Sequence, residues 1–408
     1  MRRVVVAWLA LLAVVVASPL RSQNGAADVK PALDSLISRL AAADSFSGAV
    51  MFVPAKGRAY ERSTGIANRE TTSAINMDTK IQIASATKLF TNIAIRQLEQ
   101  VGTLSLSDTV GKFLPEYHNA TVRSKVTVEQ LLKHRSGVGS FWNQRFLATL
   151  PDIRSVNDYI ALFQDDSLLF EPGTGEAYSN GGYVILGAII ERVSGKSYHD
   201  YLREHVFGPA GMKETMPYDR HSPRSNAAIG YTFQPLAGPM TGDRRLAGPG
   251  GQRPGYAPPA GASPGAPPGA RLRLVGPDGK EMSQEEARAA MARRAQAGMT
   301  RQPNASIQPG MSSPAGDHYS TVGDFVKLAR AILDRKLLDS AHTTALLGDR
   351  YARGVDFRAN GGGPGTNAEF SIFPSGDIMV VLSNYDPPAA TTVARFIRSR
   401  LLRAGAQN

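Results

Sequence analysis

Two pairs of short strand-like runs, one pair near each end of the chain, constrain the fold more than any other feature of the sequence. In each pair the runs have the length of a strand, and a short turn-forming segment that contains glycine separates them. This pattern is typical of a β-hairpin. The runs lie at 47–53 and 58–63 near the N-terminus and at 368–373 and 377–383 near the C-terminus.

The middle of the chain carries mostly helical patterns. Apolar residues recur at helical spacing at 88–100, 127–135, 156–164, 182–193 and 198–206, and also near the two ends at 29–42 and 389–402. This order favours an α+β fold, in which an antiparallel sheet built from both chain ends is flanked by helices and a mostly helical subdomain is inserted. We expect the sheet part at about 28–84 and 316–408 and the helical part at about 85–236. A crevice between the two parts is the expected substrate site.

Residues 237–315 differ in composition from the rest of the chain. Glycine, proline and alanine dominate 237–270, a turn follows at 276–279, and a charged helix-like run spans 283–297. Such a segment buries too little apolar surface to offset the entropy lost on ordering. We expect a Gly/Pro-rich, largely disordered insertion at 237–315, with a lid or a wall-binding tether as the alternative.

The first residues resemble an export signal. Arg2 and Arg3 precede an apolar run at 4–17 that ends in small residues, and polar residues follow at 22–24. The run is shorter than the roughly 20 residues that cross a bilayer, so a membrane anchor is the weaker alternative. We expect a signal peptide at 1–22, a mature domain from about residue 28 without a stable membrane span, and a periplasmic or extracellular location.

Composition narrows the chemistry. The chain has no cysteine, which excludes structural disulfides, thiolate metal sites and a cysteine nucleophile. Its seven histidines show no tight metal-ligand spacing, and no Gly-x-Ser-x-Gly elbow between a strand and a helix presents a serine for a Ser-His-Asp triad. The net charge is +11, but no basic stripe is interleaved with aromatic residues. We therefore expect no metal, no cofactor and no nucleic-acid partner.

Ser85 and Lys88 form a Ser-x-x-Lys motif. If a helix starts at the serine, residues three apart share a face, so the amine of Lys88 reaches the hydroxyl of Ser85. The helix N-terminus also stabilises negative charge that develops near Ser85. A chain of this length contains about one such spacing by chance, so the motif carries weight only together with others.

Two further elements contain groups that bind or transfer protons. Tyr178-Ser179-Asn180 precedes the helical pattern at 182–193, and Asn360-Gly361-Gly362-Gly363 precedes the last hairpin. A tyrosine exchanges protons, an asparagine binds an amide, and glycines let a substrate approach the backbone. The structural alternatives are an aromatic residue beside a helix cap and a simple turn.

The order, spacing and flanks of these three elements resemble those of the serine β-lactamase and penicillin-binding-protein superfamily, and most closely its class C β-lactamase-like branch. The resemblance covers most of the mature chain. The segments that carry it are 83–91, 97–108, 113–115, 130–138 and 170–191. Several independent segments in the right order are more specific than any single motif.

The resemblance implies a role for each matching residue. Ser85 would be the acylated nucleophile, Lys88 its partner in proton transfer, and Tyr178 the group that passes protons to the leaving group and the deacylating water. Asn180 would bind the substrate amide or fix Lys88. The oxyanion hole would consist of the backbone N–H groups of Ser85 and Gly363. Residues that would bind substrate are Asn180, Arg358, Asn360, Gly361 and Gly362.

The third element departs from the family pattern, because family members usually begin it with Lys or His and this chain has Asn360. A missing cation weakens the binding of a substrate carboxylate. Arg358 would share the face of Asn360 in a strand and could replace that cation.

We therefore expect an exported serine hydrolase that cleaves an ester, amide or β-lactam bond in a small-molecule or peptide substrate, with cell-wall compounds among the candidates. An esterase, a D-peptidase and a β-lactamase all stay open. The alternative is a catalytically silent penicillin-binding-like protein that binds a cell-wall component.

Overall fold

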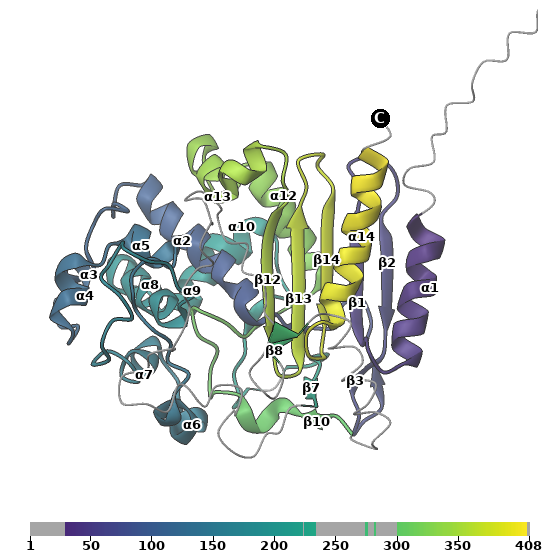
Figure 1. Cartoon of the computed structure of the whole chain (residues 1–408), viewed down its shortest axis with the longest axis horizontal. Helices are drawn as coiled ribbons and strands as arrows, with labels where there is room; N and C mark the ends of the chain where they lie inside the picture. The colour runs from purple at the N-terminus through teal and green to yellow at the C-terminus, as the bar shows by residue number, and fades with distance from the viewer. Residues whose placement is uncertain (1–28, 223, 234–273, 276–280, 283–299, 406–408) are drawn as a thin grey trace, which may run out of the picture.

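A five-stranded antiparallel sheet joins the two ends of the chain (Figure 1). The computed structural model describes residues 29–222, 224–233, 274–275, 281–282 and 300–405. The strands follow the order β12-β13-β14-β1-β2, and their bounds are Phe357–Gly363, Thr366–Ile372, Ile378–Ser383, Gly48–Val53 and Tyr60–Thr64. The junction between the ends is β1 against β14, from Gly48 opposite Ser383 to Val53 opposite Ile378.

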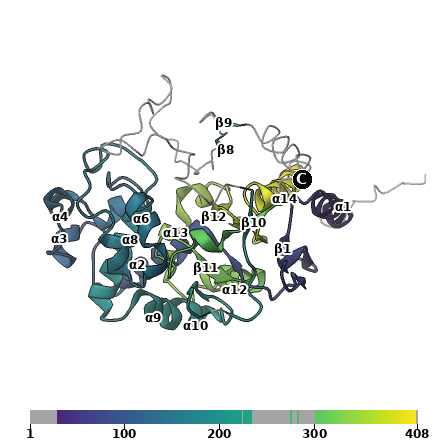
Figure 2. The same ribbon diagram turned by 90° about the horizontal axis from the view of Figure 1, so that it is seen from below.

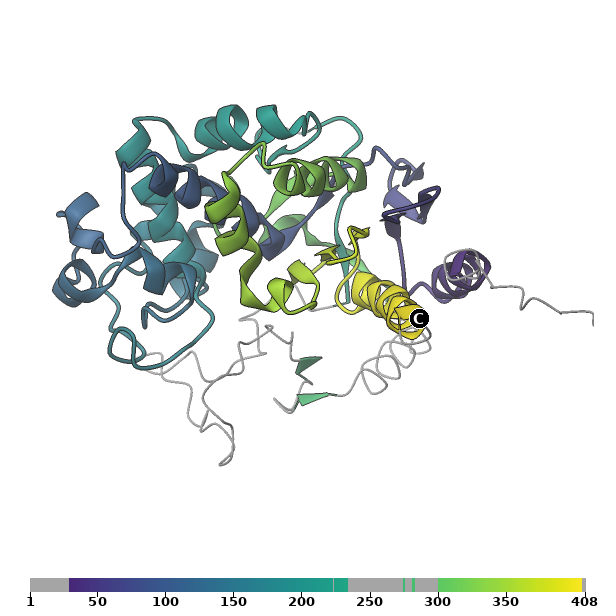
Figure 3. The same ribbon diagram turned by 90° about the horizontal axis from the view of Figure 1, so that it is seen from above.

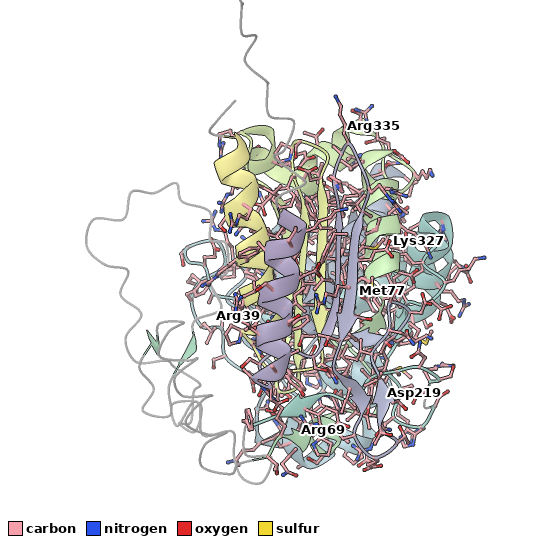
Figure 4. The ribbon with its side chains drawn as sticks, turned by 90° about the vertical axis from the view of Figure 1, so that its right-hand side faces the viewer. Arg39, Arg69, Met77, Asp219, Lys327 and Arg335 are labelled. Carbon is pink, nitrogen blue, oxygen red and sulfur yellow. The ribbon has the colours of Figure 1, made fainter. Side chains whose placement is uncertain are left out.

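Alternation along the strands gives each face of the sheet its own apolar layer. One face packs against α1 (Val29–Ala42) and α14 (Ala389–Gly405), where Val50 of β1 and Ile397 of α14 are fully buried. The other face packs against α12 (Val322–Leu333), whose Phe325 is fully buried against Phe370 of β13. Burying such a side chain stabilises the fold by about 1.5–3 kcal/mol. Figure 3 shows α1 and α14 on one side of the sheet and α12 on the other. In Figure 4, Arg39 of α1 and Lys327 of α12 mark these two sides.

The helical part lies beside the sheet (Figures 1 and 2). Its helices are α2 (Lys88–Gln100), α3 (Val110–Phe113), α4 (Ala120–Lys125), α5 (Val128–Leu132), α6 (Gln144–Thr149), α7 (Val156–Ile160), α8 (Asn180–Ser194), α9 (Tyr198–Leu202) and α10 (Gly208–Ala210), with short helical turns η1 (Ala84–Thr87), η2 (Leu150–Asp152) and η3 (Arg203–Phe207). Helix α8 is buried on all sides from Gly181 to Ile190 and forms the core of this part.

The remaining strands are short and pair in small sheets of two or three strands. They are β3 (Ile66–Asn68), β4 (Ser73–Ala74), β5 (Ile81–Gln82), β6 (Met216–Pro217), β7 (Tyr231–Thr232), β8 (Leu274–Val275), β9 (Glu281–Met282), β10 (Gln302–Pro303) and β11 (His318–Ser320), and η4 (Asn304–Ile307) follows β10. Strand β11 pairs with β5 and β6, and β5 leads directly into η1.

The predicted α+β arrangement is confirmed, and several predicted elements differ in length. The helices expected at 127–135 and 156–164 are shorter, as α5 (Val128–Leu132) and α7 (Val156–Ile160). The C-terminal part also contains α12 and α13 (Ser340–Ala352), which the sequence analysis did not identify.

The predicted insertion extends too far, because residues 300–315 are folded onto the domain. Arg301 is 4% exposed, and its guanidinium contacts the carboxylates of Asp44 and Asp386 at 3.3 Å each. The same group stacks over the rings of Phe233 and Tyr385, 4.1 and 3.9 Å from their centroids. A buried cation needs such partners. The sequence did not indicate this contact, because the segment before Arg301 is rich in glycine and proline. The turn at 276–279 and the run at 283–297 lie outside the described residues.

In the described part of the chain, no helix is long and apolar enough to cross a membrane. The predicted signal peptide at 1–22 lies outside that part.

Candidate active site

Ser85 lies in the single turn η1, between β5 and the first residue of α2. Its side chain is partly exposed, while its neighbours Ala84 and Ala86 are buried. Ala84 has a φ of +44°, a left-handed conformation that costs an ordinary side chain about 1–2 kcal/mol. The preceding strand and the following helix together hold this turn, which presents Ser85 at the junction of the sheet and the helical part.

Lys88 is the first residue of α2 and is 7% exposed. Its ammonium group donates to three acceptors: Ser85 Oγ at 3.2 Å, Asn180 Oδ1 at 2.8 Å and the carbonyl of Ala315 at 2.5 Å. An ammonium group has three donors, so these contacts use all of them. The nitrogen also lies 4.9 Å from the ring centroid of Tyr178. The side chain is therefore held in one position beside the serine.

Tyr178 and Asn180 reach the site from the start of α8. The Tyr178 hydroxyl donates to Ser85 Oγ at 2.7 Å, and the tyrosine is 47% exposed. Ser179 caps α8, since its Oγ accepts from Gly182 N at 2.8 Å. The cap fixes where the helix begins and therefore where the side chains before and after it point. The structure thus brings together four residues that the sequence analysis predicted as a group: Ser85, Lys88, Tyr178 and Asn180.

His134 supports this group and was not predicted to contribute. Its ring lies 4.7 Å from that of Tyr178, and its Nδ1 accepts a hydrogen bond from Ser179 N at 3.1 Å. Burial, reinforced by the charge of Lys88, lowers the pKa of His134 to about 4. The ring is therefore neutral at physiological pH, as an acceptor must be. The sequence signal was its place in the segment 130–138, which the resemblance already covered.

The glycine run lies on β12, the edge strand of the sheet that packs against η1. A Cβ on Gly361 would lie 2.0 Å from the Ile83 carbonyl oxygen and 3.0 Å from Ala86 N. Only glycine allows this approach. Because side chains alternate along a strand, positions 359 and 361 face η1 and positions 358, 360 and 362 face away.

The structure therefore does not bring Arg358 and Asn360 together with Ser85. Arg358 forms an ion pair with Asp356 at 2.7 Å. With the Asn360 amide oriented so that its nitrogen faces acceptors, that nitrogen donates to Glu369 at 3.2 Å, and Glu369 in turn pairs with Arg398 of α14 at 2.9 Å. Both side chains lie on the α14 face of the sheet, away from Ser85. A run of glycines has no apolar alternation, so the sequence did not indicate which residues face the serine.

The alternation along β12 also determines which of its backbone N–H groups point to the open edge, where they are able to form an oxyanion hole. The Gly361 carbonyl accepts from Asn367 Nδ2 of the neighbouring strand β13 at 3.0 Å. In an antiparallel pair the backbone groups of successive residues point alternately toward and away from the partner strand. With Gly361 turned toward β13, the N–H of Gly362 points to the open edge, and that of Gly363 points back toward β13.

Residues 315–317 lie along the turn that carries Ser85. Besides the Ala315 carbonyl that binds Lys88, Asp317 N donates to the Ala84 carbonyl at 3.2 Å, and a Cβ on Gly316 would lie 3.9 Å from Ser85 N. The sequence analysis assigned Ala315 to the insertion, so this side of the site was not predicted.

Comparison with known proteins shows the family of the chain. The family model for Beta-lactamase matches residues 33–403, which is most of the chain. The chain belongs to the beta-lactamase family. Its superfamily, the serine β-lactamases and penicillin-binding proteins, is the one that the sequence motifs indicated.

Individual members of the superfamily are similar over part or most of the chain. Penicillin-binding protein 4* of Bacillus subtilis is 33% identical over 49% of this chain and 45% of its own length. Protein flp of Staphylococcus aureus is 31% identical over 51% of this chain and 42% of its own length. The matches thus cover less than half of each of these relatives.

Solved structures share the fold. A penicillin-binding protein from Bacillus halodurans has a TM-score of 0.66 at 23% identity, covering 90% of this chain and 99% of its own. A D-amino acid amidase from Ochrobactrum anthropi, crystallised with L-phenylalanine, has a TM-score of 0.63 at 20% identity, covering 93% of this chain and 99% of its own. Membership of the beta-lactamase family supports a serine acyl-enzyme hydrolase or a penicillin-binding-protein-like binding protein.

Proposed function

We propose that this chain is an exported serine hydrolase that forms an acyl-enzyme on Ser85 and cleaves an ester or amide bond. The observation that carries the proposal is that Ser85 Oγ lies within hydrogen-bond distance of both Lys88 Nζ and the Tyr178 hydroxyl. A nucleophile needs a group that takes its proton, and these are the two candidates. The motif at 1–22 supports export.

In the proposed reaction, Ser85 Oγ attacks the carbonyl carbon of the substrate. Its proton passes to Lys88 as a free amine or to Tyr178 as a phenolate, because a protonated amine or phenol cannot accept it, and the proton then reaches the departing amine or alcohol through Tyr178. A water molecule attacks the acyl-enzyme, gives up a proton along the same path, and releases the acid with restored Ser85. The backbone N–H groups of Ser85 and Gly362 are the proposed donors to the oxyanion.

Hydrolysis of a β-lactam has less support than hydrolysis of an ester or a simple amide. A β-lactam carries a carboxylate, and Arg358, the cation proposed to bind it, instead pairs with Asp356 on the other face of β12. The name of the Ochrobactrum anthropi amidase supports including amides among the substrates.

The intact mass of the mature protein after reaction with a fluorophosphonate tests the proposal. Ser85 Oγ displaces fluoride from phosphorus, so a single adduct is expected in the wild type and in Ser140→Ala, and none in Ser85→Ala. Ser140 is the matched control because its hydroxyl also lies in the site, 3.4 Å from Asn180 Nδ2. A folded wild-type protein that gains no adduct would contradict the proposal and favour the silent binding protein. Turnover of p-nitrophenyl acetate that Ser85→Ala abolishes would then establish hydrolysis.

A further inference from the structure

Asp317 occupies a position beside the nucleophile that neither the motifs nor the proposed reaction uses. Its backbone N–H is bonded to the residue before Ser85, at 3.2 Å from the Ala84 carbonyl. Two residues earlier, Ala315 holds Lys88. Asp317 is partly exposed, and its backbone contact with Ala84 places it next to the turn that carries Ser85.

The backbone of Asp317 is in a conformation that suits glycine. Its φ is +75°, which costs an L-residue about 1–2 kcal/mol, although Asp and Asn tolerate it better than most residues. Glycine would adopt the same conformation at no steric cost. Backbone strain of this kind is found most often at functional sites, where the side chain has a use. A carboxylate at this position therefore points to a use for the carboxylate itself.

The carboxylate of Asp317 has neither a hydrogen bond nor an ion pair with any residue in the described ranges. Burial raises its pKa to about 6, and the charge of Lys88 opposes that rise. At neutral pH the group is therefore ionised. Lys88 does not neutralise it by direct contact, because all three of its donors are engaged elsewhere.

Two tyrosines lie near Asp317, since Tyr319 follows it by two residues and Tyr218 follows Pro217, which pairs with His318. The rings of Tyr218 and Tyr319 lie 5.9 Å apart, and both residues are partly exposed. Burial raises the pKa of each of these phenols and of Tyr159 of α7. The negative charge of Asp317 adds to the rise in pKa, while for Tyr218 the charge of Arg220 opposes it. These rings are therefore within electrostatic range of the carboxylate. A carboxylate beside tyrosine faces is suited to binding an ammonium group.

The positive charge of Arg358 does not face the side of β12 on which Ser85 lies. Arg358 is paired with Asp356 and faces α14. Within the described residues, the unpaired carboxylate of Asp317 therefore presents a negative charge beside Ser85, while Arg220, the cation near Tyr218, donates to the Gln308 carbonyl at 3.1 Å. A substrate with a carboxylate near the scissile bond meets repulsion, and one with an ammonium group meets attraction.

We propose that Asp317 selects substrates that carry a positively charged amine beside the bond that is cleaved, that is, amides or esters of amino acids or peptides with a free amino group. This inference rests on the proposed function, since it assigns a substrate class to the same site. Asp317 contributes a specificity contact and takes no part in the transfer of protons at Ser85.

Direct binding tests the contact without requiring turnover. Calorimetric titrations would compare phenethylammonium chloride with 2-phenylethanol, which has the same ring and no charge. We expect wild type to bind the ammonium compound at least about tenfold more tightly than the alcohol, and Asp317→Asn to show less than about threefold preference. Asparagine keeps the shape and tolerates the left-handed backbone. Asp317→Gly is the second variant, because it removes the carboxylate and the strain together.

The matched control is Asp219→Asn, which removes a carboxylate close to Tyr218 that caps the N–H of His221 at 2.8 Å. It should keep the wild-type preference. Equal affinities of the two compounds for wild type, or a preference that survives in Asp317→Asn and Asp317→Gly, would overturn the proposal.

A kinetic comparison separates this proposal from the proposed function. The substrates are phenylalanine p-nitroanilide, as each enantiomer, and 3-phenylpropionyl p-nitroanilide, which lacks the amine. We expect Asp317→Asn to reduce kcat/KM for the amine-bearing substrate at least about ten times more than for the neutral one. A fluorophosphonate adduct together with an equal loss on both substrates overturns the role of Asp317 alone. Absence of the adduct overturns the proposed function, while the calorimetric preference still decides the role of Asp317.

Discussion

At the scale of single residues, the site depends on groups whose charge and position are fixed by their neighbours. Lys88 is buried with all its donors engaged, which is the condition under which a buried ammonium group is tolerated. His134 provides the complementary case, because it has to stay neutral to accept the bond from Ser179. The two together determine where Tyr178 lies.

The lowered pKa of His134 predicts a loss of stability in acid. The unfolded chain binds a proton at about pH 6.5, whereas the folded protein binds it only near pH 4, so stability is lost as the pH falls through this window. This one group should contribute about 2 kcal/mol to the loss between pH 6.5 and pH 5. Urea titrations at about pH 7 and pH 5 should therefore show a smaller drop in the free energy of unfolding for His134→Asn than for wild type, by about that amount.

The control for this prediction is His118→Asn. The His118 ring lies on the surface, hydrogen-bonded to Asp165 at 2.8 Å. Its removal should change the drop between the two pH values by less than about 0.5 kcal/mol. If wild type and His134→Asn lost equal stability in acid, the neutral state of His134 in the folded protein would be refuted.

At the scale of elements, the decisive contact is between the edge strand β12 and the turn η1. The Gly361 backbone lies so close to Ile83 and Ala86 that no side chain fits between them. This approach places the open backbone edge of β12 beside Ser85. The capped start of α8 brings Tyr178 and Asn180 from the other side.

Gly361→Ala should therefore move β12 away from η1. The added methyl group would lie 2.0 Å from the backbone oxygen of Ile83, which cannot rotate away. We expect the rate of fluorophosphonate labelling to fall at least about tenfold and the Tm to fall by several degrees, because overpacking typically costs about 1–3 kcal/mol. The readouts are time-resolved intact mass and thermal unfolding.

Gly323→Ala is the matched control for this change. Gly323 lies in the first turn of α12, and the nearest atom to an added methyl group is Thr321 Oγ1 at 3.8 Å. Alanine there should keep the wild-type labelling rate and leave stability equal or higher by up to about 1 kcal/mol. Wild-type labelling by Gly361→Ala would show that the close approach of β12 is not needed.

At the scale of the whole molecule, segments distant in the sequence close the site together. Strand β10 pairs with β7, so Gln302 lies opposite Thr232 and Pro303 opposite Tyr231. Arg301 then fixes the segment to Asp44 and Asp386, and the chain continues to Ala315 beside Lys88. Residues 300–315 are thus part of the domain, although their composition resembles that of the preceding segment.

This arrangement predicts where the chain can be shortened. Replacing residues 237–299 with a short Gly/Ser loop should preserve folding and fluorophosphonate labelling, because β7 and β10 already lie side by side and a short loop can join them. Removing 237–315 should abolish both, because Arg301 and the Ala315 carbonyl are lost. Circular dichroism and intact mass would measure the outcomes. Loss of labelling in the shorter deletion would instead indicate a functional role for 237–299.

The sequence alone determined the features that depend on local order. Strand-length runs separated by glycine-containing turns predicted the hairpins of both chain ends, and helical spacing predicted α1, α2, α8 and α14. The spacing of three residues between Ser85 and Lys88 predicted their contact, which a helical turn forms whatever surrounds it. Tyr178 and Asn180 followed from the family pattern and from their place before a helix.

The tertiary structure alone decided which way each remaining group faces. Glycines carry no alternation of apolar and polar side chains, so only the packing of β12 against η1 shows that Gly361 faces the serine and that Arg358 and Asn360 do not. The contacts of Arg301, Ala315 and Asp317 join residues that are far apart in the sequence or on irregular backbone. No local pattern encodes such contacts, because they form only when the sheet and the helical part pack together.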